Sequence, residues 1–238
     1  MIDRYINNKI NATWNDQNRF DTWKLIQEKY VETLEELKIA EAGIAKKIRK
    51  AEISKEEVYK QEKVTNHDLA SFVDILQKKV GEGSNWVHYG LTSSDIVDSA
   101  NSILIIQSIE VAQELILNLL KELNLKAIKN KDTKIIGRTH GVYAEETFLG
   151  NIFGNWYLEI KRSLDRLERA KVSIAYGKLS GPVGNHTVVT EEMEKITLEK
   201  LGLKPEIFAS QIVSRDRYAE VFTSLSILAS PTRESQLI

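Results

Sequence analysis

The segment between Gly90 and Gly137 constrains the fold more than any other part of the sequence, because it contains neither glycine nor proline. Residues 96–128 within it are dense in isoleucine, leucine, valine and alanine. Glycine and proline disfavour the interior of a helix more than any other residue, so the segment predicts one uninterrupted helix. A helix of about 35 residues would be roughly 50 Å long at 1.5 Å per residue. That length indicates a bundle of long helices.

The rest of the chain also favours helix. Only three prolines and 12 glycines interrupt it, and the apolar residues of 22–40 recur near the three-and-four spacing of an amphipathic helix. Pro231 is expected to end the last helix, and Gly150 and Gly154 would let a neighbouring backbone approach closely. Further helices are expected over residues 44–50, 54–62, 67–80, 145–174, 191–201 and 214–230.

We therefore predict an all-α fold. A small helical N-terminal domain over residues 1–90 is followed by the first part of a bundle of long helices over residues 91–238. A bundle without its return helices would leave apolar faces uncovered. The chain is therefore expected either to pair with other chains or to be a fragment.

Charge and composition argue against several classes of protein. The 33 basic and 34 acidic residues nearly cancel, so neither a broad nucleic-acid footprint nor a membrane-attracted face is expected. The chain has no cysteine, which excludes disulfides, thiolate nucleophiles and cysteine metal sites. No run approaches the roughly 20 apolar residues of a membrane span, and the start lacks the apolar core of a signal peptide. We expect a soluble cytoplasmic protein.

The four histidines lie in polar, turn-rich segments: His67 in TNHD, His88 in VHYGLTSSD, His140 in GRTHG and His186 in GPVGNHT. Histidine changes charge near neutral pH and is the usual general acid or base. A lone histidine is nevertheless more often a solvated residue or one that satisfies the core. None of the four has the spacing of zinc ligands, so we predict no metal and no cofactor.

Three further patterns could bind an anion. Thr92, Ser93 and Ser94 stand at the expected start of the long helix, where hydroxyls and backbone amides can bind a carboxylate or phosphate. Ordinary helix capping, which needs only one of these hydroxyls, is the alternative that the spacing alone favours. The loop GKLSGPVGNHT (177–187) does not match a phosphate loop, which favours a plain connection. The arginines of QIVSRDR (211–217) are either surface charges or a carboxylate clamp.

The segment GRTHGVYAEE (137–146) also allows two interpretations. It is either a polar loop between helices or a loop that presents a histidine to a substrate.

Taken together, these segments resemble the adenylosuccinate lyase family of the fumarase/aspartase superfamily. GRTHG alone is moderately specific, but its joint occurrence with VHYGLTSSD is highly specific. Order and approximate spacing agree up to about residue 229. The matching segments are DRY (3–5), TNHDLASF (65–72), WVHYGLTSSDIVDSA (86–100), GRTHGVYAEE (137–146), GKLSGPVGN (177–185) and QIVSRDRYAE (211–220).

The resemblance implies an all-helical homotetramer whose active sites are each shared by three subunits. It implies cleavage of a small-molecule nucleotide, adenylosuccinate, to AMP and fumarate, and the matching step on the succinyl-carboxamide ribotide of purine synthesis. Both are β-eliminations in which a base removes a proton next to a carboxylate while an acid protonates the departing nitrogen.

The resemblance also implies roles for individual residues. His140 would be the general acid and Thr139 would contact the succinyl part, while Thr92 and Ser93 would hold a fumarate carboxylate. The other matching positions are Arg4 and Tyr5 for the nucleotide phosphate, His67 and Asp68 in the same nucleotide site, His88 at another site position, Gln211 for the substrate, and Ser214, Arg215 and Asp216 in a family motif without individual roles.

The sequence departs from the family pattern at several points. Tyr143 to Glu146 replace a HAEP segment that is common after GRTHG, and Tyr218 stands where RDRH is common. The more serious departure is that the family's serine-rich loop leading to MPxKxNP, which supplies the catalytic serine base, has no counterpart in this sequence. The last residues, SPTRESQLI, look like a foreign or frame-shifted tail by this comparison.

We therefore expect an N-terminal portion of such a lyase that is inactive on its own, because an acid without a base performs only half of the elimination. The alternative is a non-catalytic helical oligomerisation or nucleotide-binding protein derived from such a lyase. Another lyase of the superfamily, such as fumarase or argininosuccinate lyase, is disfavoured by HYGLTSSD.

Overall fold

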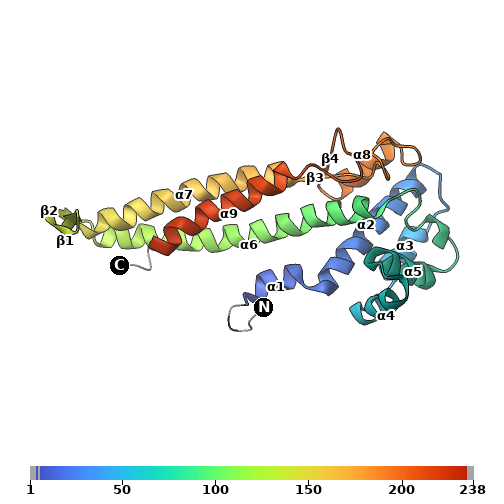
Figure 1. The fold of residues 1–238 in the computed structure, drawn as a ribbon, viewed down its shortest axis with the longest axis horizontal. Coiled ribbons are helices and arrows are strands. Elements are labelled where there is room, and N and C mark those ends of the chain that lie inside the picture. The colour runs from blue at the N-terminus through green and yellow to red at the C-terminus, as the bar shows by residue number, and fades with distance from the viewer. Residues whose placement is uncertain (1–3, 5, 235–238) are drawn as a thin grey trace. The chain divides into compact units, whose positions relative to one another are not determined.

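The computed structural model describes residue 4 and residues 6–234, with side chains described up to residue 230. The fold of this part is all-α, as the sequence predicted, with two minor two-stranded sheets (Figure 1). The helices are α1 (Asn8–Trp14), α2 (Asp16–Glu36), α3 (Ile44–Lys50), α4 (Lys55–Thr65), α5 (Asp68–Val80), α6 (Ser93–Lys129), α7 (Leu149–Ile174), α8 (Glu191–Lys200) and α9 (Asp216–Glu234), with a short 3₁₀ helix, η2, at Ser84–Trp86.

The chain forms two compact units. Unit 1 comprises Met1–Ser108 and Ala175–Arg215, and unit 2 comprises Ile109–Ile174 and Asp216–Ile238. The predicted long helix is confirmed as α6, a single 37-residue helix that contributes residues to both units. The boundary expected between residues 90 and 91 stays a prediction.

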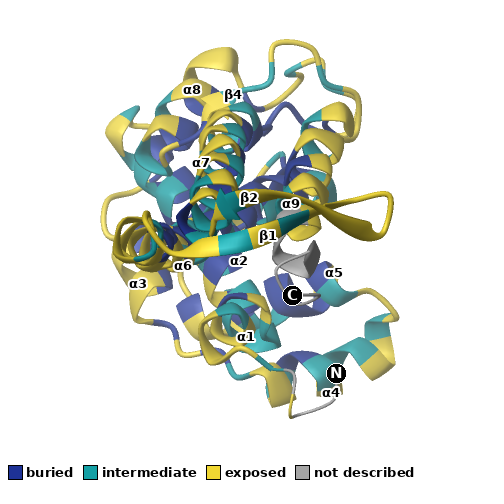
Figure 2. Ribbon diagram, turned by 90° about the vertical axis from the view of Figure 1, so that its left-hand side faces the viewer, coloured by how far each residue is buried: buried dark blue, intermediate teal, exposed yellow. Residues whose placement is uncertain are grey.

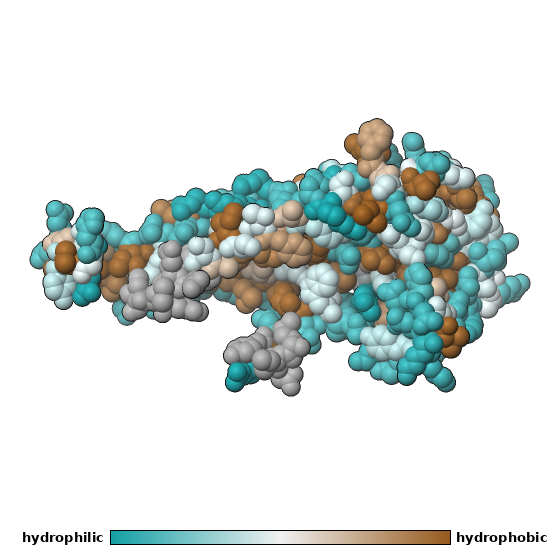
Figure 3. All heavy atoms as spheres, viewed as in Figure 1, coloured by the Kyte–Doolittle hydropathy of each residue, from teal (hydrophilic) through white to brown (hydrophobic). Residues whose placement is uncertain are grey.

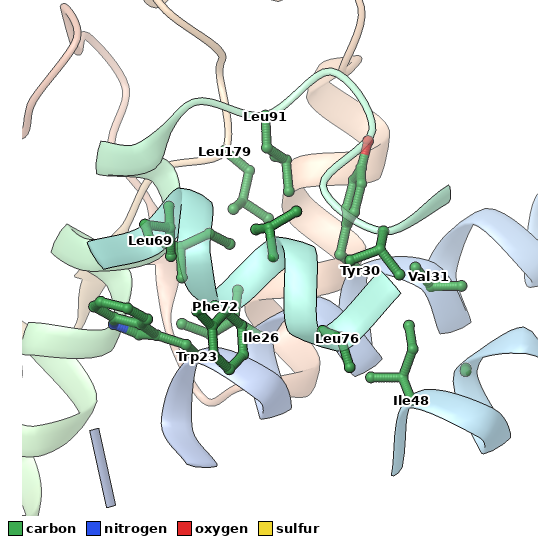
Figure 4. Close-up of a cluster of buried hydrophobic side chains, with 14 of the residues drawn as sticks. Trp23, Ile26, Tyr30, Val31, Ile48, Leu69, Phe72, Leu76, Leu91 and Leu179 are labelled. Atoms are coloured by element: carbon green, nitrogen blue, oxygen red, sulfur yellow. The ribbon is translucent and has the colours of Figure 1, made fainter. Parts of the chain in front are cut away.

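Unit 1 is built around helix α2. Its buried face carries Phe20, Trp23, Ile26 and Tyr30. The rings of Phe20 and Trp23 contact Phe72 of α5, and Figure 4 shows Trp23 and Ile26 beside Phe72. The rings of Trp23 and Phe72 meet edge to face with centroids 5.5 Å apart, an arrangement that aromatic pairs prefer. Because α2 lies at the centre of this core, polar groups on its buried face are held in fixed positions.

The helix starts of unit 1 follow capping rules that are visible in the sequence. Ser54 and Glu57 form a reciprocal capping box at the start of α4. The side chain of His67 caps α5. Helix α3 has the predicted bounds 44–50, and α5 follows the predicted range to within one residue.

Unit 2 contains the second part of α6 together with α7 and α9, which run side by side (Figure 1). Strands β1 (Lys134–Thr139) and β2 (Val142–Phe148) form an antiparallel hairpin between α6 and α7. The expectation that a helix begins at residue 145 is therefore wrong, because residues 142–148 are paired in this hairpin. Helix α7 begins at Leu149 instead.

Gly150 allows the close backbone approach that the sequence suggested. A Cβ atom there would lie 2.6 Å from the carbonyl oxygen of Ala127 and 2.9 Å from Cα of Lys131. A Cβ atom at Gly154 would meet no neighbouring element within 4 Å in the described chain, so no close approach is made there. The end of α6 and the start of α7 therefore fit together only because residue 150 has no side chain.

Helix α9 does not end at Pro231, contrary to expectation, but continues to Glu234. Proline removes one backbone hydrogen bond, and a helix that is already several turns long can propagate past such a loss more readily than it could nucleate.

Candidate active site

The start of α5 is fixed by a dense set of hydrogen bonds within TNHDLAS. The Thr65 hydroxyl accepts from the His67 backbone N–H at 3.2 Å, and the Ser71 hydroxyl donates to the His67 carbonyl at 2.8 Å. The ring Nδ1 of His67 accepts from the N–H of Ala70 at 3.3 Å and lies 3.5 Å from Oδ1 of Asp68. Local hydrogen bonds thus hold both the backbone and the ring of His67.

His67 contacts the start of α6. Its Nε2 atom lies 3.3 Å from the hydroxyl oxygen of Ser93, although the two residues are 26 positions apart. Both side chains are partly accessible to solvent. Two of the segments that carry the family resemblance are therefore joined by a direct side-chain contact.

The hydroxyls at the start of α6 do not act as its caps. The backbone N–H of Thr92 donates to Oδ2 of Asp95 at 2.8 Å, as in one half of a capping box. Within the described part of the chain, the hydroxyls of Thr92 and Ser94 have no hydrogen-bond partner. The first turn of α6 therefore offers hydroxyls and unpaired backbone amides together, which suits an anion.

Asp95 is also bound by a buried lysine that sequence reasoning missed. Both side chains of the Lys178–Asp95 ion pair are completely buried. The ammonium of Lys178 also donates to the carbonyl of Gly181 at 2.9 Å, and its backbone N–H donates to the Ser99 hydroxyl at 3.2 Å. Burial raises the pKa of Asp95, and Lys178 opposes that rise.

The loop 177–187 thus fastens the start of α6 and does not merely connect helices. Its other side is held by α8, because Oε1 of Glu194 accepts from the N–H of Leu179 at 2.6 Å. Burial raises the pKa of Glu194. The only sequence signal for this role was the glycine-rich composition of the loop.

His88 is clamped by Gln27, a second residue that sequence reasoning missed. Gln27 is completely buried on α2, and its amide makes two hydrogen bonds of 2.9 Å to His88, one to the backbone N–H and one to Nδ1. The backbone of His88 is left-handed, with φ of 65°, which few residues other than glycine adopt. Burial, followed by the charge of nearby His67, lowers the pKa of His88 to about 4.

His140 lies at the tip of the β1–β2 hairpin, in unit 2. Thr139 pairs with Val142, so His140 and Gly141 form a two-residue turn, and both have positive φ, 54° and 78°. These values match a type I′ turn, which suits the twist of a hairpin. His140 and Thr139 are exposed, as is most of the hairpin (Figure 2). The polar loop considered from the sequence is therefore a hairpin that presents its histidine to solvent.

The arginines of QIVSRDR are engaged within the protein. Arg215 donates to Oδ1 of buried Asp98 on α6 at 3.0 Å, and the N–H of Val213 donates to its Oδ2 at 3.0 Å. Arg217 donates to the Ser173 carbonyl at 2.9 Å. These contacts anchor the segment. The Arg215 side chain is nevertheless 49% exposed, so it is a paired surface charge, and a role of these arginines as a ligand clamp stays a prediction.

The remaining predicted residues are less constrained. Gln211 is exposed and makes no hydrogen bond to any described residue. Arg4 is exposed in unit 1, and Tyr5 lies outside the described residues. The structure thus brings together His67, Asp68 and the Thr92–Ser93 helix start. It places His140 and Thr139 in the other unit.

No group of three or more histidine, aspartate or glutamate side chains in the described residues could hold a metal ion. The absence of a metal from the mechanism stays a prediction.

Comparisons with known proteins place the sequence in a family of enzymes. A family model described as "Lyase" matches residues 8–231. The adenylosuccinate lyase of Thermotoga maritima is 39% identical over 231 residues, and that of Bacillus subtilis is 37% identical over 234; each match covers 97% of this chain and 54% of the relative. The chain therefore spans about half the length of these curated relatives.

Solved structures show the same fold at lower identity. A fumarate lyase from Mesorhizobium sp. BNC1 has a TM-score of 0.88 at 20% identity, over 94% of this chain and 55% of that one. The β-carboxy-cis,cis-muconate cycloisomerase of Acinetobacter calcoaceticus sp. ADP1 also has a TM-score of 0.88, at 19% identity over 97% and 57% of the two chains. With the family model and the sequence relatives, these matches show that the chain belongs to the lyase family and is homologous to adenylosuccinate lyases.

Proposed function

We propose that this chain provides the general acid and the substrate contacts of an adenylosuccinate lyase. The reaction would release fumarate from adenylosuccinate, giving AMP, and from the succinyl-carboxamide ribotide of purine biosynthesis. The observation that carries the proposal is the contact between His67 and Ser93. It joins two family segments at an open helix start, in a chain whose sequence relatives are adenylosuccinate lyases.

The start of α6 supports the binding of a carboxylate. The hydroxyl of Thr92 has no partner in the described chain, and the first backbone N–H groups of α6 have none within the helix. The positive end of the helix dipole adds to the attraction for an anion. Thr92 and Ser93 would hold one carboxylate of the succinyl group there, with His67 and Asp68 on the nucleotide side.

His140 would protonate the departing nitrogen. In the β-elimination, a base removes the proton next to a carboxylate, the electron pair forms the carbon–carbon double bond of fumarate, and the carbon–nitrogen bond breaks. His140 supplies the proton that the leaving nitrogen needs. We propose that the base comes from outside these 238 residues and that the chain alone does not turn over substrate.

We further propose that copies of this chain associate through their long helices, as in a homotetramer. Large apolar side chains of α6 are exposed in the described structure: Leu115, Leu117, Leu119, Leu125 and Ile128. Hydrophobic residues recur along the long helices on the face drawn in Figure 3. Exposed apolar surface of this extent marks an interaction site.

Helix α6 is also long and apolar enough to cross a membrane by length and composition, although no such segment was expected from the sequence. Serine and glutamine residues interrupt its apolar run, so that a count of consecutive apolar residues overlooks it. Its first part belongs to the core of unit 1, where Ile96, Ala100 and Leu104 are buried. This burial supports partner helices as the cover for the remainder, in a cytoplasmic enzyme.

The proposal can be tested by complementation. The chain is assayed for fumarate release from adenylosuccinate alone, and again with a polypeptide comprising the part of the Bacillus subtilis relative that the match does not cover. We expect turnover only in the second mixture, called the complemented assay below. Loss of that turnover in the His140→Asn chain would assign the acid to this protein.

Other outcomes are equally informative. Family-like turnover by the chain alone would disprove the requirement for an external base. No turnover in either mixture, combined with binding of AMP in calorimetry, would favour the second candidate, a non-catalytic nucleotide-binding oligomer. The exposed apolar residues of α6 favour that candidate independently of any chemistry, and sedimentation analysis would test it.

A further inference from the structure

We propose that Gln27 is a positioning residue that holds His88 as a neutral imidazole with its proton on Nε2. His88 would thereby present an Nε2–H hydrogen-bond donor to an anionic group of the substrate. The assignment of the proton rests on the structure alone, whereas the role toward substrate rests on the proposed function.

The two hydrogen bonds of Gln27 determine both the amide orientation and the tautomer. The backbone N–H of His88 can only donate, so the amide atom facing it must be the oxygen, Oε1, at 2.9 Å. The other end of the amide, Nε2, then faces Nδ1 of His88, also at 2.9 Å. An amide NH₂ group only donates, so Nδ1 must be an unprotonated acceptor. The proton of the neutral ring therefore lies on Nε2.

Burial prevents the amide from turning over. Gln27 has no exposed surface, and reversing its amide would place oxygen against an acceptor and NH₂ against a donor in the protein interior. Such groups would lose the hydrogen bonds they make with water in the unfolded chain and gain none in the interior. Tyr30, one turn further along α2, donates to the carbonyl of Tyr89 at 2.9 Å, so the same face of α2 holds the next residue of the loop as well.

The Nε2–H of His88 is left available by the described part of the chain, which provides no acceptor for it. His67 is the titratable neighbour that acts on His88, and its charge opposes protonation of the ring. The low pKa of His88 agrees with a ring that stays neutral at neutral pH. A neutral imidazole that donates from Nε2 is suited to bind an anion without taking part in proton transfer.

The assignment can be tested by nuclear magnetic resonance of the chain with ¹⁵N-labelled histidine. The chain has four histidines, so single substitutions assign each resonance. At neutral pH we expect a protonated Nε2 and an unprotonated Nδ1 for His88. His186 provides an internal reference for a ring that carries a proton on Nδ1, because its Nδ1 lies 3.0 Å from the carbonyl oxygen of Val189 and must donate. A proton on Nδ1 of wild-type His88 would overturn the proposal without any variant.

The Gln27→Glu variant tests whether Gln27 determines the tautomer of His88. It keeps an oxygen for the His88 backbone N–H but places a second oxygen against Nδ1, which must then carry a proton. We expect His88 to hold its proton on Nδ1 at alkaline pH and to become doubly protonated as the pH falls. Gln77→Glu is the matched control, since Gln77 donates to the carbonyl of adjacent Val87 at 3.4 Å without contacting the His88 ring. A folded Gln27→Glu chain with an unchanged His88 spectrum would refute the role of Gln27.

The complemented assay tests the role toward substrate. At a pH where Gln27→Glu has its only His88 proton on Nδ1, we expect KM for adenylosuccinate to rise about tenfold or more, the factor for losing a hydrogen bond to a charged group. Lowering the pH restores Nε2–H and should restore KM. Gln77→Glu should show neither effect.

The tautomer of His88 and its role toward substrate can be refuted independently of each other. An unchanged KM despite a switched tautomer would remove the substrate role and leave the positioning intact. No turnover of the complemented wild-type chain would count against the proposed function but not against the tautomer, which is measured without substrate. The substrate role would then be judged from the shift of the His88 resonances on adding AMP or fumarate, and no shift with either would refute it.

Discussion

The ammonium of Lys178 is bound to the carboxylate of Asp95 in the interior of unit 1, with both side chains completely buried. The pair joins the 177–187 loop to the first turn of α6, next to Thr92 and Ser93. Because the carboxylate also accepts from the N–H of Thr92, the same group both fastens the loop and shapes the proposed carboxylate site.

Lys178→Met should therefore strongly destabilise unit 1. Removing one partner of a buried ion pair leaves an uncompensated charge and typically costs about 3–5 kcal/mol. The free energy of unfolding in urea, followed by circular dichroism and tryptophan fluorescence, measures the change. Lys79→Met is the control, because Lys79 pairs with Glu57 at 2.7 Å on the surface, where such a pair contributes about 0–1 kcal/mol. Equal stability of the two variants would contradict the prediction.

His88 should make stability depend on pH. Burial lowers its pKa from 6.5 to about 4, so between these values the unfolded chain binds more protons than the folded one. Its contribution is fully present above pH 6.5, falls as the pH decreases, and is lost below about pH 4. A shift of this size corresponds to roughly 3 kcal/mol.

Comparing urea unfolding of the wild type and His88→Asn at about pH 7 and about pH 4 isolates this contribution. Asparagine tolerates the left-handed backbone at this position. The comparison is needed because the raised pKa values of Asp95 and Glu194 act in the opposite sense. Their contributions are present at acid pH and lost as the pH rises through the folded-state values. A wild type and variant that lose stability in parallel would show that His88 is not the group responsible.

Substitution by alanine should change the stability of unit 2 in opposite directions at Gly150 and at Gly154 of α7. Gly150→Ala forces a methyl group against the backbone of Ala127 and Lys131, so it should destabilise unit 2 by about 1–3 kcal/mol, as overpacking does. Gly154→Ala meets no atom of the described chain and should stabilise the helix by roughly 0.5–1 kcal/mol. Thermal unfolding of both variants decides the matter. A destabilising Gly154→Ala would indicate that Gly154 packs against another copy of the chain.

The long helix could be predicted from the sequence because it depends on local pattern. The absence of glycine and proline between residues 90 and 137 was enough to predict α6, and the shared apolar face of residues 67–80 was enough to predict α5 to within one residue. The hairpin was missed because its strands are polar, mostly exposed and flanked by long helices. Only the positive φ angles at His140 and Gly141 reveal the turn, and histidine is not a strong sequence signal for it.

The candidate site likewise contains some residues that the sequence indicated and others that it did not. Family motifs indicated His67, Thr92 and Ser93, and the contact of His67 with Ser93 brings their two segments together in unit 1; the roles of these residues stay predictions. Gln27 and Lys178 could not be predicted, because their roles come from contacts 61 and 83 residues away in the chain. Within the sequence they look like one polar residue on a helix and one lysine in a loop.

His140→Asn should separate the chemistry of the hairpin from its folding. His140 and Gly141 occupy a type I′ turn, and asparagine followed by glycine is among the most favourable sequences for that turn. The substitution should therefore leave the hairpin and the thermal unfolding temperature essentially unchanged while removing the imidazole. In the complemented assay we expect fumarate release to fall by about 10²–10⁴-fold, the usual contribution of a general acid.

His186→Asn is the control, since His186 also has a left-handed backbone, with φ of 53°, but lies in unit 1 and has no proposed catalytic role. If both variants retain full turnover, His140 is not the acid; if His140→Asn loses turnover together with the hairpin's backbone resonances, the turn and not the imidazole is responsible.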